Sequence, residues 1–294
     1  MLGLHISSRK PSFTPKSVCF NQAGDGREEK LRLTTSDGKF TARVFIPNFV
    51  DRYLPPVIAL HGISRNADAI YTAFAASAID SGRILIVPRF SRKHWPVFQR
   101  PGNVRPDQAI LALIEMLRNS GTIQTESFEL FGFSGGAQLA HRFAMLYPYL
   151  VSRLHLASAG WYCLPDVSLS YPAGLGQPIR PLRENENNLL EKMRAQLADY
   201  LRLPLRVYVG TADTSQDKAL RSKPRLDAVQ GPHRLARARS YVAHFSKAAK
   251  MHGITPDVRL FSLDNCGHDF SQCAVSGGLI RHVFSNTNTL SFNK

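Results

Sequence analysis

Short apolar runs alternate with longer amphipathic segments along most of the chain. The apolar runs are rich in β-branched residues and are typical of strands buried on both faces of a parallel sheet. They are PPVIALHG (55–62), RILIVP (83–88), SFELFGF (127–133), VSRLHLAS (151–158), LPLRVYVG (203–210) and DVRLFSL (257–263). Between them, helical periodicity predicts helices over residues 67–82, 105–121, 135–148 and 234–253, and a closing helix over 272–286.

Strands that alternate with helices predict the α/β class, with a mostly parallel central sheet and helices on both faces. Before this pattern, KLRLTT (30–35) and FTARVFIP (40–47) flank Asp37-Gly38, which is typical of a β-hairpin. Residues 1–29 are interpreted as an N-terminal tail. Since no linker or repeat divides residues 30–294, we expect one domain there.

The segment 161–204 interrupts the alternation. Its first half is rich in proline and glycine, and its second half has a helical pattern. Long excursions of this kind are often lids over a functional site, so we expect a lid or cap insertion that brings Trp161, Tyr162 and Tyr171 to a pocket. A surface decoration without contact to any site is the alternative.

Composition and charge narrow the classes of function. A chain of 294 residues with 44% hydrophobic and 20% charged residues is expected to fold rather than to stay disordered. The net charge is +15, but the basic residues are scattered and no nucleic-acid-binding signature is present, so we expect no nucleic-acid partner. No run is long enough for a membrane span, and the N-terminus lacks the apolar core of a signal peptide, so we expect a cytoplasmic protein.

The four cysteines, Cys19, Cys163, Cys266 and Cys273, have no zinc-ligand spacing. Free buried thiols are expected in a cytosolic protein, although a local disulfide between Cys266 and Cys273 is conceivable. No metal or organic cofactor is predicted.

The candidate catalytic residue is Ser134 in the stretch GFSGG, which lies between a predicted strand and a predicted helix. Gly132 and Gly136, two residues before and after Ser134, would let the strand and the helix pack closely around a sharp turn. No other serine in the chain has this frame of glycines. The context favours a nucleophile over a plain glycine-rich turn.

Four stretches in the order VIALHGI, GFSGG, VGTADT and NCGHDF resemble the α/β-hydrolase fold family over roughly residues 30–285. Within it, the chain is similar to serine esterases of the polyhydroxybutyrate-depolymerase or feruloyl-esterase type. The resemblance implies a triad in the chain order serine, acid, histidine. Asp213 then follows the strand after the insertion as the acid, with Asp217 as its rival, and His268 after the last strand is the base.

The resemblance also implies an oxyanion hole, built from the backbone N–H groups of Gly135 and Ile63. His61 would support the Ile63 loop by hydrogen bonds. The stretch VPRFSRKHWP, with His94 and Trp95, and the stretch GPHRLARAR, after Asp213, resemble the same subgroup. Four residues are the weaker candidates for substrate contact: His61, Trp95, Trp161 and Tyr162.

The implied activity is hydrolysis of a carboxylic ester, small or polymeric, through an acyl-enzyme. Peptidases, thioesterases and amidases use the same constellation, so these activities remain alternatives. A non-catalytic ligand-binding protein on this fold is the alternative from another class. The sequence leaves the physiological substrate and the oligomeric state open.

Overall fold

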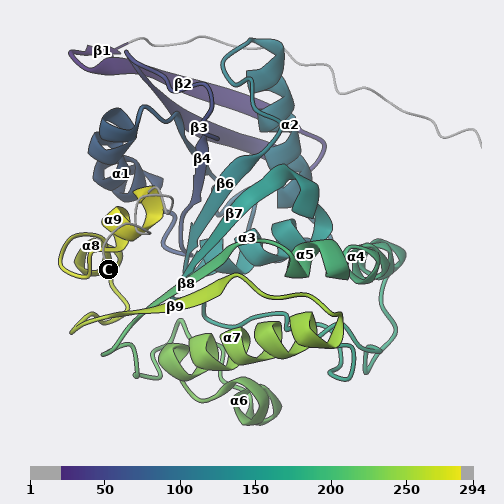
Figure 1. Ribbon diagram of the computed structural model, residues 1–294. Helices are drawn as coiled ribbons and strands as arrows, with labels where there is room; N and C mark the ends of the chain where they lie inside the picture. Colours follow the sequence, from purple (N-terminus) through teal and green to yellow (C-terminus); the bar gives the residue numbers. More distant parts are fainter. Residues whose placement is uncertain (1–20, 286–294) are drawn as a thin grey trace, which may run out of the picture.

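The computed structural model describes residues 21–285, which contain a nine-stranded sheet in the order β1-β2-β3-β5-β4-β6-β7-β8-β9 (Figure 1). The strands from β5 to β9 in this order are parallel to one another. They are β5 (Leu85–Arg89), β4 (Val57–Leu60), β6 (Phe128–Phe133), β7 (Val151–Ala157), β8 (Leu205–Gly210) and β9 (Val258–Leu263). The predicted mostly parallel α/β sheet is confirmed.

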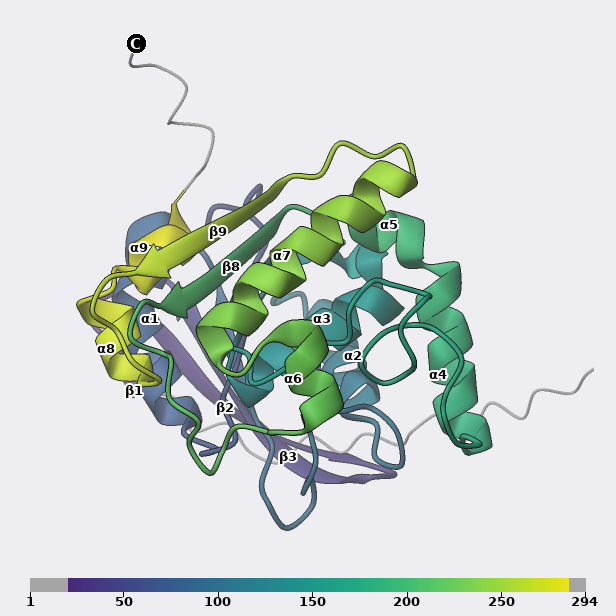
Figure 2. The same cartoon turned by 90° about the horizontal axis from the view of Figure 1, so that it is seen from below.

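Successive side chains of the parallel strands point to opposite faces of the sheet and pack into two separate cores. In β4, Ile58 and Leu60 pack into the core with α2 (Pro106–Asn119), α3 (Gly135–Leu146) and α7 (Arg234–Met251). Val57 and Ala59 pack into the core of the opposite face. That face is covered by α1 (Ala67–Ser81), α8 (Phe270–Val275) and α9 (Leu279–Phe284). Helices on both faces explain why all of β4, β6 and β8 is buried (Figure 2).

The N-terminal edge is antiparallel and begins earlier than predicted. β1 (Asn21–Ala23) pairs with β2 (Gly26–Thr35), which pairs along its whole length with β3 (Gly38–Pro47). The hairpin is confirmed, but the tail over residues 1–29 is too long, because residues 21–29 belong to the sheet. Their charges misled the prediction: one face of this ribbon meets solvent, where Glu28 pairs with Arg43 at 2.9 Å. Residues 1–20 lie outside the described part of the chain.

The segment 161–204 packs on the body of the domain. Its helices α4 (Glu184–Ala195) and α5 (Leu197–Leu201) lie against α3, and Leu190, Met193 and Leu201 are buried in the main core. Figure 2 shows α4 and α5 at the side of the molecule opposite α8 and α9.

Three further elements differ from the pattern-based expectations. The closing helix is two short helices, α8 and α9, because Gly278 adopts the left-handed conformation with φ 68°. The helix α6 (Pro224–Gln230) and the 3-10 turn η1 (Pro148–Leu150) were not predicted. Both are short and begin with a proline.

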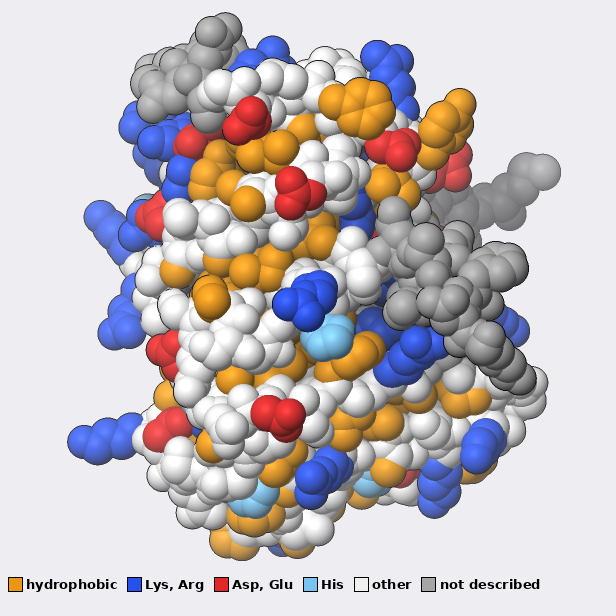
Figure 3. All heavy atoms as spheres, turned by 60° about the vertical axis from the view of Figure 1, so that its left-hand side comes forward, with side chains coloured by type: hydrophobic (Ala, Val, Ile, Leu, Met, Phe, Trp, Pro, Cys, Tyr) orange, Lys and Arg blue, Asp and Glu red, His pale blue; other side chains and the backbone are white. Residues whose placement is uncertain are grey.

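Cys163, Cys266 and Cys273 are buried free thiols, so the conceivable Cys266–Cys273 disulfide is not formed, while Cys19 lies outside the described residues. Over residues 21–285, no helix is both long and apolar enough to cross a membrane. Figure 3 shows the face that carries α1, α8 and α9, where acidic and basic side chains are interspersed with apolar ones.

Candidate active site

Ser134 lies at a sharp turn between β6 and α3. Its backbone has φ 55° and ψ −112°, a strained conformation for a residue with a side chain. The neighbouring glycines leave no room for larger residues: a Cβ on Gly136 would clash with the carbonyl oxygen of Leu60, and one on Gly132 with the backbone of Gly136. The glycine frame read from the sequence therefore has a steric cause, which is the close approach of β6, α3 and the end of β4.

His268 connects Ser134 to Asp213. It follows β9, and its Nε2 lies 3.1 Å from Oγ of Ser134 while its Nδ1 lies 3.1 Å from Oδ2 of Asp213. This geometry suits one tautomer, in which Nδ1–H donates to the carboxylate and Nε2 accepts the hydroxyl hydrogen of Ser134. The imidazole also stacks on Phe133, with ring centroids 5.3 Å apart.

The side chain of Gln272 contacts the loop that carries His268 at two points. Oε1 of Gln272 accepts from the Gly267 N–H at 3.0 Å, and its Nε2 donates to the Asn265 carbonyl at 3.0 Å. Gln272 in turn belongs to α8, whose N-cap is Asp269. Asp269, the neighbour of His268, is therefore engaged in capping a helix and not in orienting the imidazole.

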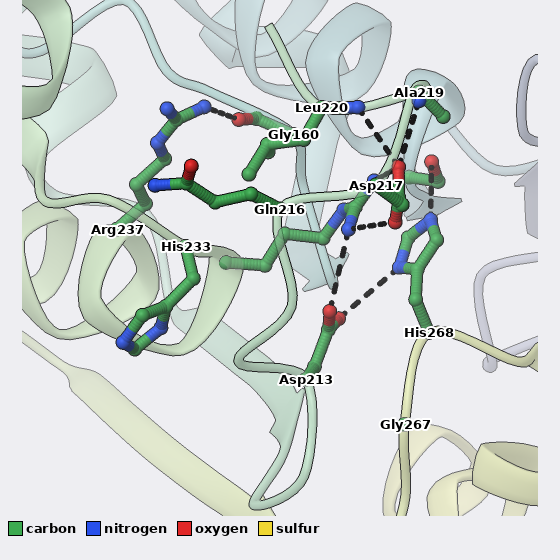
Figure 4. Close-up of polar contacts among 12 residues, drawn as sticks. Gly160, Asp213, Gln216, Asp217, Ala219, Leu220, His233, Arg237, Gly267 and His268 are labelled. Carbon is green, nitrogen blue, oxygen red and sulfur yellow. Dashed lines mark hydrogen bonds and ion pairs between the residues drawn. The ribbon is translucent and has the colours of Figure 1, made fainter. Parts of the chain in front are cut away.

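Asp213 and Asp217 lie near His268 (Figure 4), and both carboxylates accept from the guanidinium of Arg234. Asp213 is fully buried and receives Nη1 of Arg234 at 3.4 Å. Asp217 receives the same guanidinium at 2.7 and 3.1 Å and the backbone N–H groups of Ala219 and Leu220. The hydrogen bonds from Arg234 are the main cause that lowers the pKa of Asp217 to about 2. Asp213, rather than its rival Asp217, lies against the imidazole.

The predicted oxyanion donors lie close together. A Cβ built on Gly135 would lie 3.2 Å from the backbone N of Ile63, and one on Gly62 would lie 3.3 Å from Cβ of Ser134. Gly135 is the first residue of α3, where the backbone N–H has no partner within the helix. The amides of Gly135 and Ile63 thus belong to adjacent backbone segments next to the hydroxyl of Ser134.

His61 supports the loop that carries Ile63. Its Nδ1–H donates to the Gly62 carbonyl at 2.8 Å, and its Nε2 accepts the Phe90 N–H at 2.9 Å. Burial lowers the pKa of His61 to about 4, which keeps the ring neutral as these bonds require. With both nitrogens occupied by backbone, His61 has no free atom for a substrate.

A pocket opens beside Ser134 on the side of α1. It is lined by the apolar side chains of Ile63, Ala69, Ile70, Phe133 and Phe270, together with polar groups and Ala219. The lining comes from the β4–α1 loop, α1, the end of β6, the loop after β8, the loop before α8 and the start of α8. No residue of the segment 161–204 lines it, so the insertion does not cover this pocket.

The weaker candidates for substrate contact do not line the pocket beside Ser134. Trp95 is fully buried against Phe40 and Phe90, and its Nε1 donates to the Lys39 carbonyl at 2.9 Å. His94 lies against Gly38 at the turn of the β2–β3 hairpin. Packing in the core accounts for the position of Trp95, whereas His94 is half-buried at the hairpin turn.

Two aromatic residues at the start of the insertion differ in their surroundings. Tyr162 is fully buried and stacks on Tyr241 with centroids 4.1 Å apart. Trp161 keeps 5% exposure and lies under arginine side chains. Trp161 is therefore the one of the pair that lies near the surface.

Sequence reasoning missed Arg234 and the apolar lining of the pocket. The sole signal for Arg234 was its place at the start of the helix after Asp213. Among residues 21–285, no group of three or more His, Cys, Asp or Glu side chains is arranged to hold a metal ion.

Comparison of sequences finds neither a protein-family model nor a curated protein that matches the chain. Comparison of structures finds a poly(aspartic acid) hydrolase-1 from Sphingomonas sp. KT-1, with a TM-score of 0.71, 24% identity and coverage of 87% of this chain and 97% of that one. A poly(3-hydroxybutyrate) depolymerase from Bordetella parapertussis has a TM-score of 0.72, 23% identity and coverage of 89% of each chain.

A more distant similarity relates the chain to an S-formylglutathione hydrolase from Agrobacterium tumefaciens. The TM-score is 0.57 and the identity 16%, over 92% of this chain and 97% of that one. The sheet order, the turn at Ser134 and these three neighbours agree on one architecture. The chain therefore has the α/β-hydrolase fold.

Proposed function

We propose that the protein is a serine hydrolase that cleaves carboxylic esters through an acyl-enzyme. The observation that carries the proposal is the bridge formed by His268, with Ser134 on one ring nitrogen and Asp213 on the other, each at 3.1 Å. A serine hydroxyl is a weak nucleophile at neutral pH, and an adjacent imidazole oriented by a carboxylate is what activates it.

In the first half-reaction, Oγ of Ser134 attacks the carbonyl carbon of the ester while Nε2 of His268 takes the hydroxyl proton. Asp213 stabilises the imidazolium that forms. The N–H groups of Ile63 and Gly135 donate to the oxyanion of the tetrahedral intermediate. His268 then gives its proton to the leaving alkoxide, and the acyl group stays on Ser134.

In the second half-reaction, His268 takes a proton from water, and the resulting hydroxide attacks the acyl carbon. The second tetrahedral intermediate collapses, the carboxylic acid leaves, and Oγ of Ser134 recovers its proton from the imidazolium. No metal or organic cofactor enters either step.

Arg234 is proposed as a positioning residue for this chemistry. It binds the oxygen of Asp213 that His268 does not use, and it is itself fixed by Asp217. A buried carboxylate without a second partner would be free to rotate away from the imidazole, so the guanidinium preserves the hydrogen bond to Nδ1.

Ester hydrolysis is the reaction class favoured by the structural neighbours, which include a poly(3-hydroxybutyrate) depolymerase and a ferulic acid esterase. The apolar pocket beside Ser134 fits an acyl or aryl group of an ester.

The direct test is labelling with a fluorophosphonate probe, which reacts with an activated serine. We expect the parent protein to be labelled and the Ser134→Ala variant to remain unlabelled. The same pair is then assayed with 4-nitrophenyl butyrate, on which only the parent should release 4-nitrophenol. A parent protein that neither takes the label nor hydrolyses the ester contradicts the proposal.

A further inference from the structure

Two arginine side chains lie close to the ring of Trp161, at the start of the insertion. Cζ of Arg142 is 4.4 Å from the centroid of the Trp161 ring, and Cζ of Arg221 is 5.0 Å from it. Both distances suit cation–π contacts. Arg142 comes from α3, and Arg221 comes from the loop between β8 and α6, so two separate segments bring positive charge to one indole.

Arg142 is buried without a counter-charge. Its exposed fraction is 2%, its Nη1 donates to the Gln138 carbonyl at 2.8 Å, and its Nη2 has no hydrogen-bond partner. Burial lowers the pKa of Arg142 to about 10, and Arg100 is a positive neighbour that adds to this effect. A buried cation is costly unless it is paired, so this position needs an explanation.

The other strongly buried arginines of the described chain are all paired with acids. Arg83 contacts Glu129 at 3.2 Å, and Arg237 contacts Asp227 at 2.6 Å. Arg206 pairs with Asp257, and Arg234 with Asp213 and Asp217. Over residues 21–285, the ion pairs found include none for Arg100, Arg142 or Arg221. The arginines near Trp161 therefore differ from the strongly buried arginines elsewhere in the described chain, in that the ion pairs found give them no acidic partner.

Each of the three arginines belongs to a segment that also contains a residue of the nucleophile's surroundings. Arg142 lies about two turns along α3 from Ser134. Arg221 is two residues beyond Ala219, which lines the pocket beside Ser134. Arg100 is two residues beyond Phe98, whose ring would lie 3.5 Å from a Cβ on Gly135. The arginines thus belong to segments that also border Ser134 or its pocket.

We propose that Arg142 and Arg221, which lie against Trp161, and the neighbouring Arg100 form a subsite for a carboxylate of the substrate. The inference rests on the proposed function, since it specifies the ester as one that also carries a free carboxylate. Arg100 and Arg221 provide the donors that reach the ligand, because both are more exposed than Arg142. Arg142 adds a fixed, buried positive charge against the indole.

The kinetic test compares esters that differ by one carboxylate. Mono(4-nitrophenyl) glutarate is matched with 4-nitrophenyl valerate for the acyl side, and 4-acetoxybenzoate with 4-methylphenyl acetate for the alcohol side. In at least one pair we expect kcat/KM of the parent to favour the anionic ester by about tenfold or more, the range of a charge-assisted contact. In the double variant Arg100→Gln/Arg221→Gln, this ratio should fall towards one.

The matched control removes the same charge elsewhere. Arg52 and Arg239 are exposed residues outside the cluster, so the double variant Arg52→Gln/Arg239→Gln should keep the ratio of the parent. A parent without preference in either pair overturns the proposal. A preference that is equally reduced in both double variants also overturns it, because the effect would then come from net charge.

A binding measurement tests the subsite independently of catalysis. We expect disodium glutarate to change the tryptophan fluorescence of the Ser134→Ala variant saturably, glutaramide to leave it unchanged, and Trp161→Phe to remove the response. Glutarate without effect on the fluorescence overturns the subsite even if esters are hydrolysed. A saturable response in a protein that hydrolyses no ester supports the subsite and counts against the proposed function alone.

Discussion

Nη1 of Arg234 lies 3.4 Å from Oδ1 of Asp213, on the carboxylate oxygen that His268 leaves free. Both side chains are almost completely buried, with exposed fractions of 1% for Arg234 and 0% for Asp213. Asp217 accepts from the same Nη1 and from Nη2 of this guanidinium. The proposed acid is therefore fixed from two directions, by the imidazole and by a cation that is itself anchored.

Replacing Arg234 should damage both stability and activity. Arg234→Met leaves the buried Asp213 without its cation, a change that typically costs about 3–5 kcal/mol. We expect a lower urea midpoint and a lower kcat on 4-nitrophenyl butyrate, and partial recovery in Arg234→Lys. Arg239→Met, at an exposed position of the same helix, is the control and should change stability by less than about 0.5 kcal/mol. Equal midpoints for Arg234→Met and the control would contradict the role of Arg234.

The two aspartates beside His268 are distinguished by substitution. Asp213→Asn presents an amide to Nδ1 and favours the wrong imidazole tautomer, so kcat should fall by about 10³–10⁴-fold. Asp217→Asn weakens the anchor of Arg234 and the acceptor of the Ala219 and Leu220 N–H groups but keeps Asp213 against His268, so it should lower kcat by less than about tenfold. Steady-state kinetics on one ester decides between them. A larger loss in Asp217→Asn would reverse the assignment of the acid.

The glycines around Ser134 leave no space for a side chain, so adding a methyl group there should disrupt the packing. Gly136→Ala places a methyl group against the Leu60 carbonyl, so α3 must move away from β4. We expect destabilisation of at least about 3 kcal/mol and loss of fluorophosphonate labelling. Gly102→Ala is the matched control, since its nearest neighbour atom lies at 3.8 Å and its φ is not positive. Urea unfolding of both variants checks the prediction, which fails if Gly136→Ala is as stable as the control.

The pocket on the α1 side should set the preference for acyl or aryl size. Ala69 lines this pocket from the first turn of α1, so Ala69→Phe fills part of it. We expect kcat/KM for 4-nitrophenyl octanoate to fall by about tenfold or more relative to the acetate, while kcat/KM for the acetate changes less. Ala76→Phe adds the same ring at an exposed position of α1 and should leave the ratio unchanged. An unchanged ratio in Ala69→Phe would exclude this pocket as a substrate pocket.

Buried histidines should make the protein sensitive to acid. Burial lowers the pKa of His61 to about 4 and that of His141 well below its usual value, so both rings are neutral in the folded state. Below about pH 6.5 the unfolded chain binds protons that the folded chain does not, and stability falls as the pH falls. The shift of His61 alone corresponds to roughly 2 kcal/mol between pH 7.5 and pH 5.

Urea unfolding at these two pH values measures the effect. In a His141→Gln variant the difference between pH 7.5 and pH 5 should be smaller than in the parent, because one of the protonating rings is absent. Equal stability of the parent at both pH values would show that the buried rings do not control acid unfolding.

The central sheet was predicted correctly because the composition of each strand reflects its burial. Burial on both faces demands unbroken apolar runs, and such runs are visible at Val57–Leu60 and Leu205–Gly210. Prediction failed where a strand is half exposed. The charged start of β2, around Glu28, has the composition of a tail, and only its pairing with β3 makes it a strand.

The sequence by itself determined the fold class and the frame of Ser134, because glycine spacing and apolar runs act through local sterics and burial. It also put Asp213 and His268 after the strands from which His268 reaches Ser134 and Asp213 reaches His268. The tertiary structure decided which groups meet across long distances in the chain. Arg234 joins Asp213 to Asp217, Trp95 and Tyr162 pack into the core, and Arg142 and Arg221 both lie against the ring of Trp161. Such contacts depend on how separate segments pack, and no local pattern of residues encodes them.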